Sequence, residues 1–236
     1  MAKQNLQNEN QLKEQESIRQ EKVTETLSRT EKFFTAYKKA VYIGIAAVLV
    51  IVLAVLCYHK FYYQPKKAEA QEQMFPAENN FRSEEYELAL NGDGNVLGFA
   101  QIIKEYGAKA GASTFLYAGV CELHLGNFEN AISYLKKYNG KDPILAARAL
   151  ACIGDSYIGL EKYDEALSFF KKAAGKADNM YKATYLLKAG VTCEQLGKND
   201  EALTYYKEIK DQFPQSIEGY DIDKYISRIE SQQTTK

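Results

Sequence analysis

The sequence predicts an all-α protein in which a single N-terminal transmembrane helix is followed by an α-solenoid of helix–turn–helix repeats. The first observation is a run of nineteen consecutive uncharged residues, Ala40–Tyr58, near the start of an otherwise polar chain. The second is a ten-residue pattern that recurs three times, with central alanines at Ala131, Ala166 and Ala202. The alanines are 35 and 36 residues apart. Repeats of this period are typical of helix pairs that stack because one pair cannot bury its apolar face alone.

The apolar run has the length of a membrane span. At about 1.5 Å of rise per residue it covers roughly 28 Å, close to the hydrocarbon thickness of about 30 Å. Lys39 precedes the run, and Lys60 follows it with the aromatic residues Phe61–Tyr63, as at a membrane interface. A buried helix of a soluble protein is the alternative, but it rarely carries so long an uninterrupted run. We therefore expect residues 40–63 to cross a lipid bilayer.

Two processed forms of the N-terminus fit less well. A removable signal peptide has a shorter n-region than the 39 polar residues found here, and a shorter apolar segment. A lipoprotein needs a small residue before its acylated cysteine, whereas Leu56 precedes Cys57. The run is therefore predicted to be an uncleaved anchor.

The charges beside the run predict its orientation. Five basic residues lie within about twenty residues before it and three follow it: Lys22, Arg29, Lys32, Lys38 and Lys39, against Lys60, Lys66 and Lys67. Since basic flanks favour the cytoplasmic side, we expect a cytoplasmic N-terminus and a C-terminal part on the far side. Cys121, Cys152 and Cys193 oppose this topology, because unpaired thiols fit an oxidising compartment poorly.

Composition indicates neither nucleic-acid binding nor catalysis. The net charge is −1, and no Lys/Arg cluster interleaved with aromatics is present. The sequence contains no Gly-rich phosphate loop, no H-E-x-x-H pattern and no nucleophile elbow. Cys121 and His124 share a helical face, but no second ligand pair follows at zinc spacing. We predict a non-enzymatic protein without cofactor or metal.

The repeat has a recognisable internal pattern. A glycine stands twelve residues before each central alanine, at Gly119, Gly154 and Gly190. This combination resembles the tetratricopeptide repeat, a helix–turn–helix unit of about 34 residues. The resemblance covers residues 112–216 and implies that each glycine faces its alanine where two antiparallel helices come closest. It also implies that Pro143 and Pro214 each help to stop a helix.

The repeat register predicts the organisation of the chain. A degenerate unit is expected at about residues 81–110, and a capping helix at Gly219–Ile229. The expected segments are a cytoplasmic polar tail with a pre-anchor helix (1–39), the transmembrane helix (40–63), a linker (64–80), the repeat domain (81–232) and a short tail (233–236). Residues 64–78 are also compatible with a continuing helix.

Tetratricopeptide arrays usually bind peptides or helices of other proteins in a concave groove lined by the first helix of each unit. By this resemblance the groove positions are Leu116, Val120, Leu123, Arg148, Asp155, Thr184, Leu187, Val191 and Glu194. For Val120, Leu123 and Val191, packing against neighbouring helices is an equal alternative. A subgroup of the family binds terminal carboxylates through Lys, Asn and Arg. The matching positions here hold Leu116, Val120, Cys152, Thr184 and Lys188. Only Lys188 among them could do so, and we therefore expect an apolar groove without that clamp.

The order of tail, membrane helix and repeats, together with Glu31-Lys32-Phe33-Phe34, resembles the YfgM-like ancillary subunit of the bacterial Sec translocon. The resemblance implies a single-pass protein of the cytoplasmic (inner) membrane with a periplasmic repeat domain. It implies partners among the translocon, periplasmic chaperones and translocating polypeptides. The alternatives are a general scaffold or a regulator of another cell-envelope assembly complex.

Overall fold

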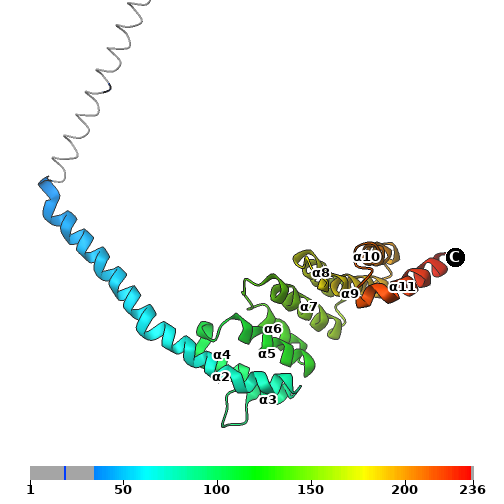
Figure 1. Ribbon diagram of the computed structural model, residues 1–236, viewed down its shortest axis with the longest axis horizontal. Coiled ribbons are helices and arrows are strands. Elements are labelled where there is room, and N and C mark those ends of the chain that lie inside the picture. Colours follow the sequence, from blue (N-terminus) through cyan, green and yellow to red (C-terminus); the bar gives the residue numbers. More distant parts are fainter. Residues whose placement is uncertain (1–18, 20–34, 235–236) are drawn as a thin grey trace, which may run out of the picture. The chain divides into compact units, whose positions relative to one another are not determined.

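The computed structural model describes residue 19 and residues 35–234, and within these ranges all regular secondary structure is helical. The chain divides into two units, Met1–Tyr62 and Tyr63–Lys236. Most of the predicted N-terminal tail and pre-anchor helix lie outside the described residues, as do residues 235–236 of the predicted C-terminal tail. Figure 1 shows the helices of the second unit in chain order.

Among the residues that the structure describes, one helix is long and apolar enough to cross a membrane. It extends over Thr35–Arg82, with a π-helical turn, η1, at His59–Tyr63, and its most apolar eighteen-residue window is not buried by any other part of the described chain. Ile43, Val50 and Leu53 are among the exposed side chains of this window. A helix of this length and composition is compatible with a membrane anchor or a signal sequence.

Residues 64–78, for which the sequence left a linker or a helix open, lie in helix α2 (Gln64–Arg82) of the second unit. Ala70, Met74 and Ala77 on one face of α2 are buried against α3 (Tyr86–Asn91), α4 (Phe99–Tyr106) and α5 (Ala112–His124). This spacing of four and three residues places the three side chains on one helical face. Helices α3 and α4 form a helix pair within the degenerate unit expected at about residues 81–110.

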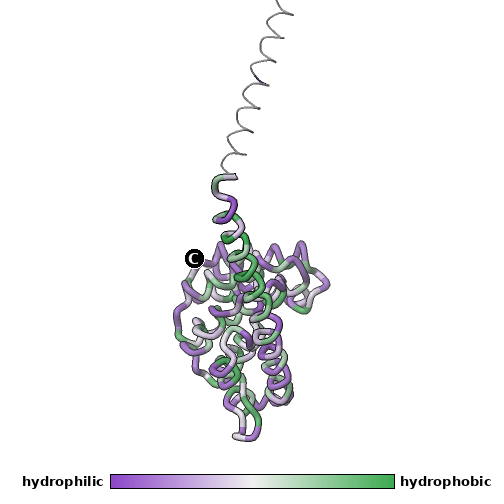
Figure 2. Tube along the Cα trace, turned by 90° about the vertical axis from the view of Figure 1, so that its left-hand side faces the viewer, coloured by the Kyte–Doolittle hydropathy of each residue, from purple (hydrophilic) through white to green (hydrophobic). Residues whose placement is uncertain are grey.

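The clear repeats are three antiparallel helix pairs, and each first helix is longer than or similar to its partner. The pairs are α5 with α6 (Phe128–Leu135), α7 (Pro143–Gly159) with α8 (Tyr163–Lys176), and α9 (Tyr181–Gln195) with α10 (Asn199–Gln212). A 3₁₀ turn, η2 (Gly107–Ala110), precedes α5. Polar and apolar residues alternate along these helices (Figure 2), because each helix buries one face between its neighbours.

The repeat glycines make room for a large side chain of the second helix. The central alanines Ala131, Ala166 and Ala202 are fully buried. However, the atoms nearest to a methyl group placed on Gly154 belong to the Phe170 ring, at 2.5 Å. Gly119 meets Leu135 and Gly190 meets Tyr206 in the same way. Each glycine therefore lies against the residue four positions after the alanine, one helical turn further along, and in the first pair the Ala131 carbonyl oxygen is also only 3.2 Å from the methyl position.

The turns inside the three pairs share one geometry. The residues Gly126, Glu161 and Gly197 all have positive φ, at 78°, 58° and 69°. In the middle turn, the Lys162 amide donates to the Tyr157 carbonyl at 2.9 Å, and equivalent bonds close the other two turns. These are the left-handed C-terminal caps that glycine normally provides, and Glu161 adopts the same conformation without being glycine.

Pro143 and Pro214, the two prolines of the repeat region, lie at opposite ends of helices. Pro214 follows the end of α10, as predicted. The prediction that Pro143 stops a helix is wrong, because α6 already ends at Leu135 and Pro143 is the first residue of α7. Asp142 caps α7 by accepting hydrogen bonds from the amides of Ile144 (2.8 Å) and Leu145 (3.0 Å). A proline fits the first helical turn, where its missing amide hydrogen is not needed.

The predicted capping helix is present as α11 (Ile217–Thr234), longer than the expected segment. Ile222, Ile226 and Ile229 cover the last apolar face against α10 and α9, whereas Tyr220 is exposed. Glu194 on α9 fixes this arrangement, because its carboxylate accepts from the Tyr206 hydroxyl on α10 at 2.5 Å and from Arg228 on α11 at 2.6 Å. The solenoid therefore ends in a closed hydrophobic core.

Candidate protein-binding groove

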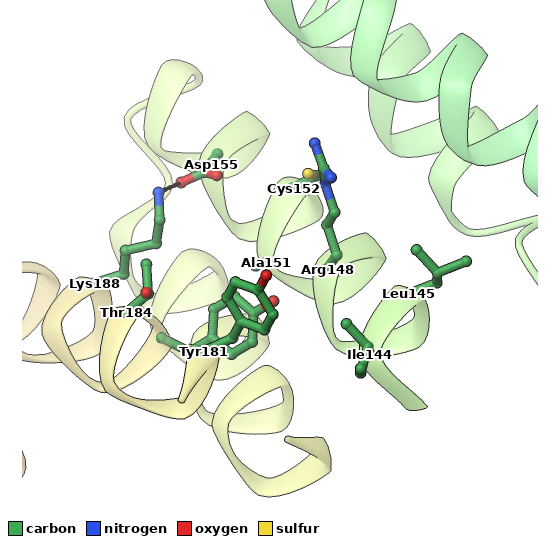
Figure 3. A pocket seen from close by; sticks show the side chains of 10 residues that line it. Ile144, Leu145, Arg148, Ala151, Cys152, Asp155, Tyr181, Thr184 and Lys188 are labelled. Carbon is green, nitrogen blue, oxygen red and sulfur yellow. Dashed lines mark hydrogen bonds and ion pairs between the residues drawn. The ribbon is translucent and has the colours of Figure 1, made fainter. Parts of the chain in front are cut away.

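Helices α7 and α9 are the first helices of consecutive repeats, and a groove of about 470 Å³ lies between them (Figure 3). Both helices pack on α8. The groove is lined by residues of their first and middle turns: Ile144, Leu145, Arg148, Ala151, Cys152, Asp155, Tyr181, Thr184, Tyr185 and Lys188. Ile144 and Tyr181 each lie within the first two positions of their helix and leave 43% and 51% of their surface exposed.

A second cavity of about 600 Å³ continues the first towards the other end of α7 and α9, since Asp155, Thr184 and Lys188 line both. Its further lining residues are mainly apolar and aromatic: Ile158, Tyr163, Phe170, Leu187, Val191, Thr192 and Gln195. We call the two cavities together the α7–α9 groove. One half of this groove carries charges among apolar groups, and the other half is mostly apolar.

One ion pair crosses the groove where its halves meet, and a hydrogen bond beside it leads from α9 to α11. The Lys188 ammonium group lies 2.6 Å from the Asp155 carboxylate, which joins α9 to α7 (Figure 3). The Thr184 hydroxyl donates to the Glu218 carboxylate of α11 at 2.6 Å. Both side chains of the ion pair remain partly exposed, and its contribution to stability is therefore no more than about 1 kcal/mol. Its effect is to neutralise the middle of the groove.

The polar side chains beside Arg148 are uncharged. Burial raises the pKa of the Cys152 thiol to about 11, and Asp155 adds to this shift. Burial also raises the pKa of the Tyr185 phenol. Both groups are therefore protonated near neutral pH, and the buried thiol of Cys152 is not in its nucleophilic form.

Five of the nine predicted groove residues line the α7–α9 groove: Arg148, Asp155, Thr184, Leu187 and Val191. The other four do not. Leu116 and Val120 on α5 are 5% and 4% exposed and belong to the core shared by α5, α6 and α7, with Leu123 packed against it. Glu194 is engaged by Tyr206 and Arg228. Leu116 and Val120 therefore contribute to the core, and for Val120 and Leu123 this packing is the alternative that the sequence left open.

The sequence reading missed Ile144 and Tyr181. A signal for them exists, because apolar side chains recur at the starts of the first helices α7 and α9, at Ile144 and Tyr181, and again at Ile217 on the capping helix α11. The expectation of an apolar groove was also incomplete, since Arg148 and the pair Lys188–Asp155 line it.

Within residues 35–234, no group of three or more His, Cys, Asp or Glu side chains is arranged to hold a metal ion. Cys121 is buried, and burial raises its pKa to about 12. The His124 ring stacks on the Tyr86 ring with a centroid distance of 4.1 Å. The two residues that could have suggested a zinc site therefore have separate structural roles.

Comparison with known proteins agrees with this architecture. Residues 152–217 match the family model of the tetratricopeptide repeat. These residues form a tetratricopeptide-repeat region. No curated protein matches the sequence. The solved structure described as the crystal structure of MamA protein is similar, with a TM-score of 0.55 and 18% identity over 69% of this chain and 82% of that chain.

A further MamA crystal structure has a TM-score of 0.49 and 18% identity, and covers 68% of this chain and 97% of that chain. At this level of identity the similarity to MamA concerns the fold. Tetratricopeptide folds are typically non-catalytic scaffolds for interaction between proteins.

Proposed function

We propose that the protein is a non-enzymatic, membrane-anchored scaffold that binds segments of other proteins in the α7–α9 groove. The observation that carries this proposal is the groove itself, in which Leu187 and Val191 are left partly exposed beside the aromatic residues Tyr163 and Phe170. Apolar grooves between helices are suited to extended or helical segments that insert apolar side chains. The groove lies on consecutive repeats, whose neighbouring helices hold its walls in place.

The anchor in this proposal is the apolar segment 40–63, with the repeat domain beginning near its end. Exposed apolar side chains along this segment support a lipid environment, because burying them there removes the cost of contact with water. Five basic residues before the segment against three after it support a cytoplasmic N-terminus. The repeat domain then lies on the outer side of the inner membrane of a bacterium. The boundaries between tail, anchor and repeat domain are part of the same proposal.

This topology predicts that external protease digests the repeat domain in spheroplasts and spares the cytoplasmic tail. The measurement is an immunoblot with one epitope tag at each end of the chain, before and after lysis. A C-terminal tag that is lost only after lysis would contradict the orientation.

The finer proposal concerns the partner. The order of the segments and the motif Glu31-Lys32-Phe33-Phe34 support the Sec translocon and periplasmic chaperones as partners, with the groove receiving segments of secretory proteins. The rival is a scaffold for another cell-envelope complex. The two proposals differ in which protein meets the groove and share the same groove chemistry.

Photo-crosslinking from the groove in native membranes separates them. A benzoylphenylalanine at Val191, which is 37% exposed in the groove, is expected to form an adduct that contains a translocon subunit. The matched control is the same amino acid at Ile217, which is 85% exposed and lies outside the lining of the groove. Adducts are identified by mass spectrometry.

Adducts between position 191 and a different envelope complex would contradict the proposal of a translocon partner and would support the rival proposal of a scaffold for that complex. Equal adducts from Val191 and Ile217 would contradict binding in the groove. The substitution Val191→Asp gives an independent check. It is expected to reduce partner recovery at least tenfold, because loss of a buried apolar contact and burial of a carboxylate both oppose binding.

A further inference from the structure

The α7–α9 groove contains an unbalanced positive charge. Three charged side chains line it: Arg148, Asp155 and Lys188. Lys188 and Asp155 neutralise one another at 2.6 Å, whereas within the described part of the chain no carboxylate forms an ion pair with Arg148. Among the charged side chains that line the groove, Arg148 is therefore the one that no other lining residue neutralises.

The surroundings of Arg148 do not supply an internal anion. Its side chain lies beside the Cys152 thiol in the close view (Figure 3), and the nearby phenol of Tyr185 is likewise protonated near neutral pH. Asp155 is two turns further along α7 and is already bound by Lys188. Arg148 therefore hydrogen-bonds the neutral Cys152 thiol and no carboxylate, and its remaining donors can bind an acceptor that enters the groove.

Apolar groups flank this charge on both sides. Ile144 and Tyr181 are partly exposed at one end, and Leu187 and Val191 line the other half of the groove. A small anion bound at Arg148 alone would leave these apolar side chains exposed to water. The lining thus fits a ligand that carries one negative charge between apolar side chains.

We propose that the groove recognises an internal Asp or Glu side chain of a partner polypeptide, bound by Arg148, within an otherwise apolar segment. This inference rests on the proposed function and adds the chemistry of the ligand. Charge complementarity carries it, because a carboxylate can accept two parallel hydrogen bonds from a guanidinium group. The terminal carboxylate of a partner is not required, since the usual clamp positions here include Leu116 and Val120, which are buried.

The length of the groove sets the spacing in the ligand. Ten residues separate Arg148 from Ile158 on α7, which corresponds to about 15 Å along the helix axis. An extended peptide advances about 3.3 Å per residue. A ligand that spans both halves in extended form therefore places an apolar side chain four or five residues from its acidic residue.

The test is a selection of random twelve-residue peptides displayed on phage, with their C-termini fused to the coat protein so that no free carboxylate is present. The bait is the full chain in detergent. The variants are Arg148→Gln and the matched control Lys224→Gln, an exposed lysine of α11 outside the groove. Circular dichroism checks that both variants are folded.

We expect the wild-type protein and Lys224→Gln to enrich peptides with Asp or Glu four or five residues from an apolar residue, and Arg148→Gln to lose the acidic preference. A synthetic, amidated consensus peptide should bind Arg148→Gln at least tenfold more weakly. Its Glu→Gln analogue should show the same loss with the wild type and no additional loss with Arg148→Gln.

Enrichment of apolar peptides without an acidic preference would overturn this inference and leave the groove as the binding site. Enrichment that Val191→Asp does not reduce would place binding outside the groove and overturn the proposed function as well. Failure to enrich any peptide would likewise overturn both this inference and the proposed function.

Discussion

Leu116→Asp is expected to unfold the clear repeats, although the repeat register places this residue on a binding surface. Leu116 is 5% exposed and packs against residues of α6 and α7. Removing a buried leucine typically costs about 2–5 kcal/mol, and a carboxylate without a partner adds to that cost. We expect a loss of about 4 kcal/mol or more, measured by urea unfolding followed by circular dichroism.

The matched control is Ile217→Asp, which introduces the same carboxylate at an apolar residue that is 85% exposed. It should change stability by about 0.5 kcal/mol or less. Equal unfolding midpoints for the two variants would contradict the burial of Leu116 and return α5 to the set of candidate binding surfaces.

The sequence predicted the helical solenoid because its signals are local and repeated. Ala131, Ala166 and Ala202 are fully buried at the predicted interval, and Gly126, Glu161 and Gly197 occupy the same left-handed turn position. Each of these features depends on contacts within one helix pair. A repeat conserves such contacts in every unit, and they are therefore visible in a single chain.

The candidate site was predicted only in part because it depends on which helices cover which face. Leu116 and Leu187 are both leucines on first helices, yet only Leu187 lines a groove. The register assigns both to the same side of the solenoid. The difference arises from the packing of α5 with α6 and α7, which is tertiary and has no signal at the position itself.

The short α2–α4 region shows the same limit. Sequence left residues 64–78 open between a linker and a helix, because this segment has no strong apolar period. In the structure, Ala70, Met74 and Ala77 form a narrow buried stripe against α3 and α4. Two of the three side chains are alanines, which allow the helices to approach closely. Alanines add little to the hydrophobic periodicity of the sequence, and the buried face is therefore hard to recognise there.

Ala166→Leu is expected to destabilise the middle repeat strongly. Ala166 on α8 is fully buried, and one turn further along the same helix the Phe170 ring already fills the space left by Gly154. Three additional carbon atoms at position 166 must therefore displace α7 or α9. Overpacking of this kind costs about 1–3 kcal/mol or more. The thermal midpoint should fall by roughly 2–4 °C for each kcal/mol lost.

Ser168→Leu is the control for this variant, because it introduces the same side chain on the same helix at an exposed position. Its thermal midpoint should stay within about 2 °C of the wild type, consistent with the small effects of surface substitutions. Similar shifts for the two variants would mean that α8 does not present Ala166 to α7 and α9. In that case the walls of the α7–α9 groove would also be misplaced, since α8 holds both helices at its sides. The stability of Ala166→Leu therefore tests the framework on which the binding proposal depends.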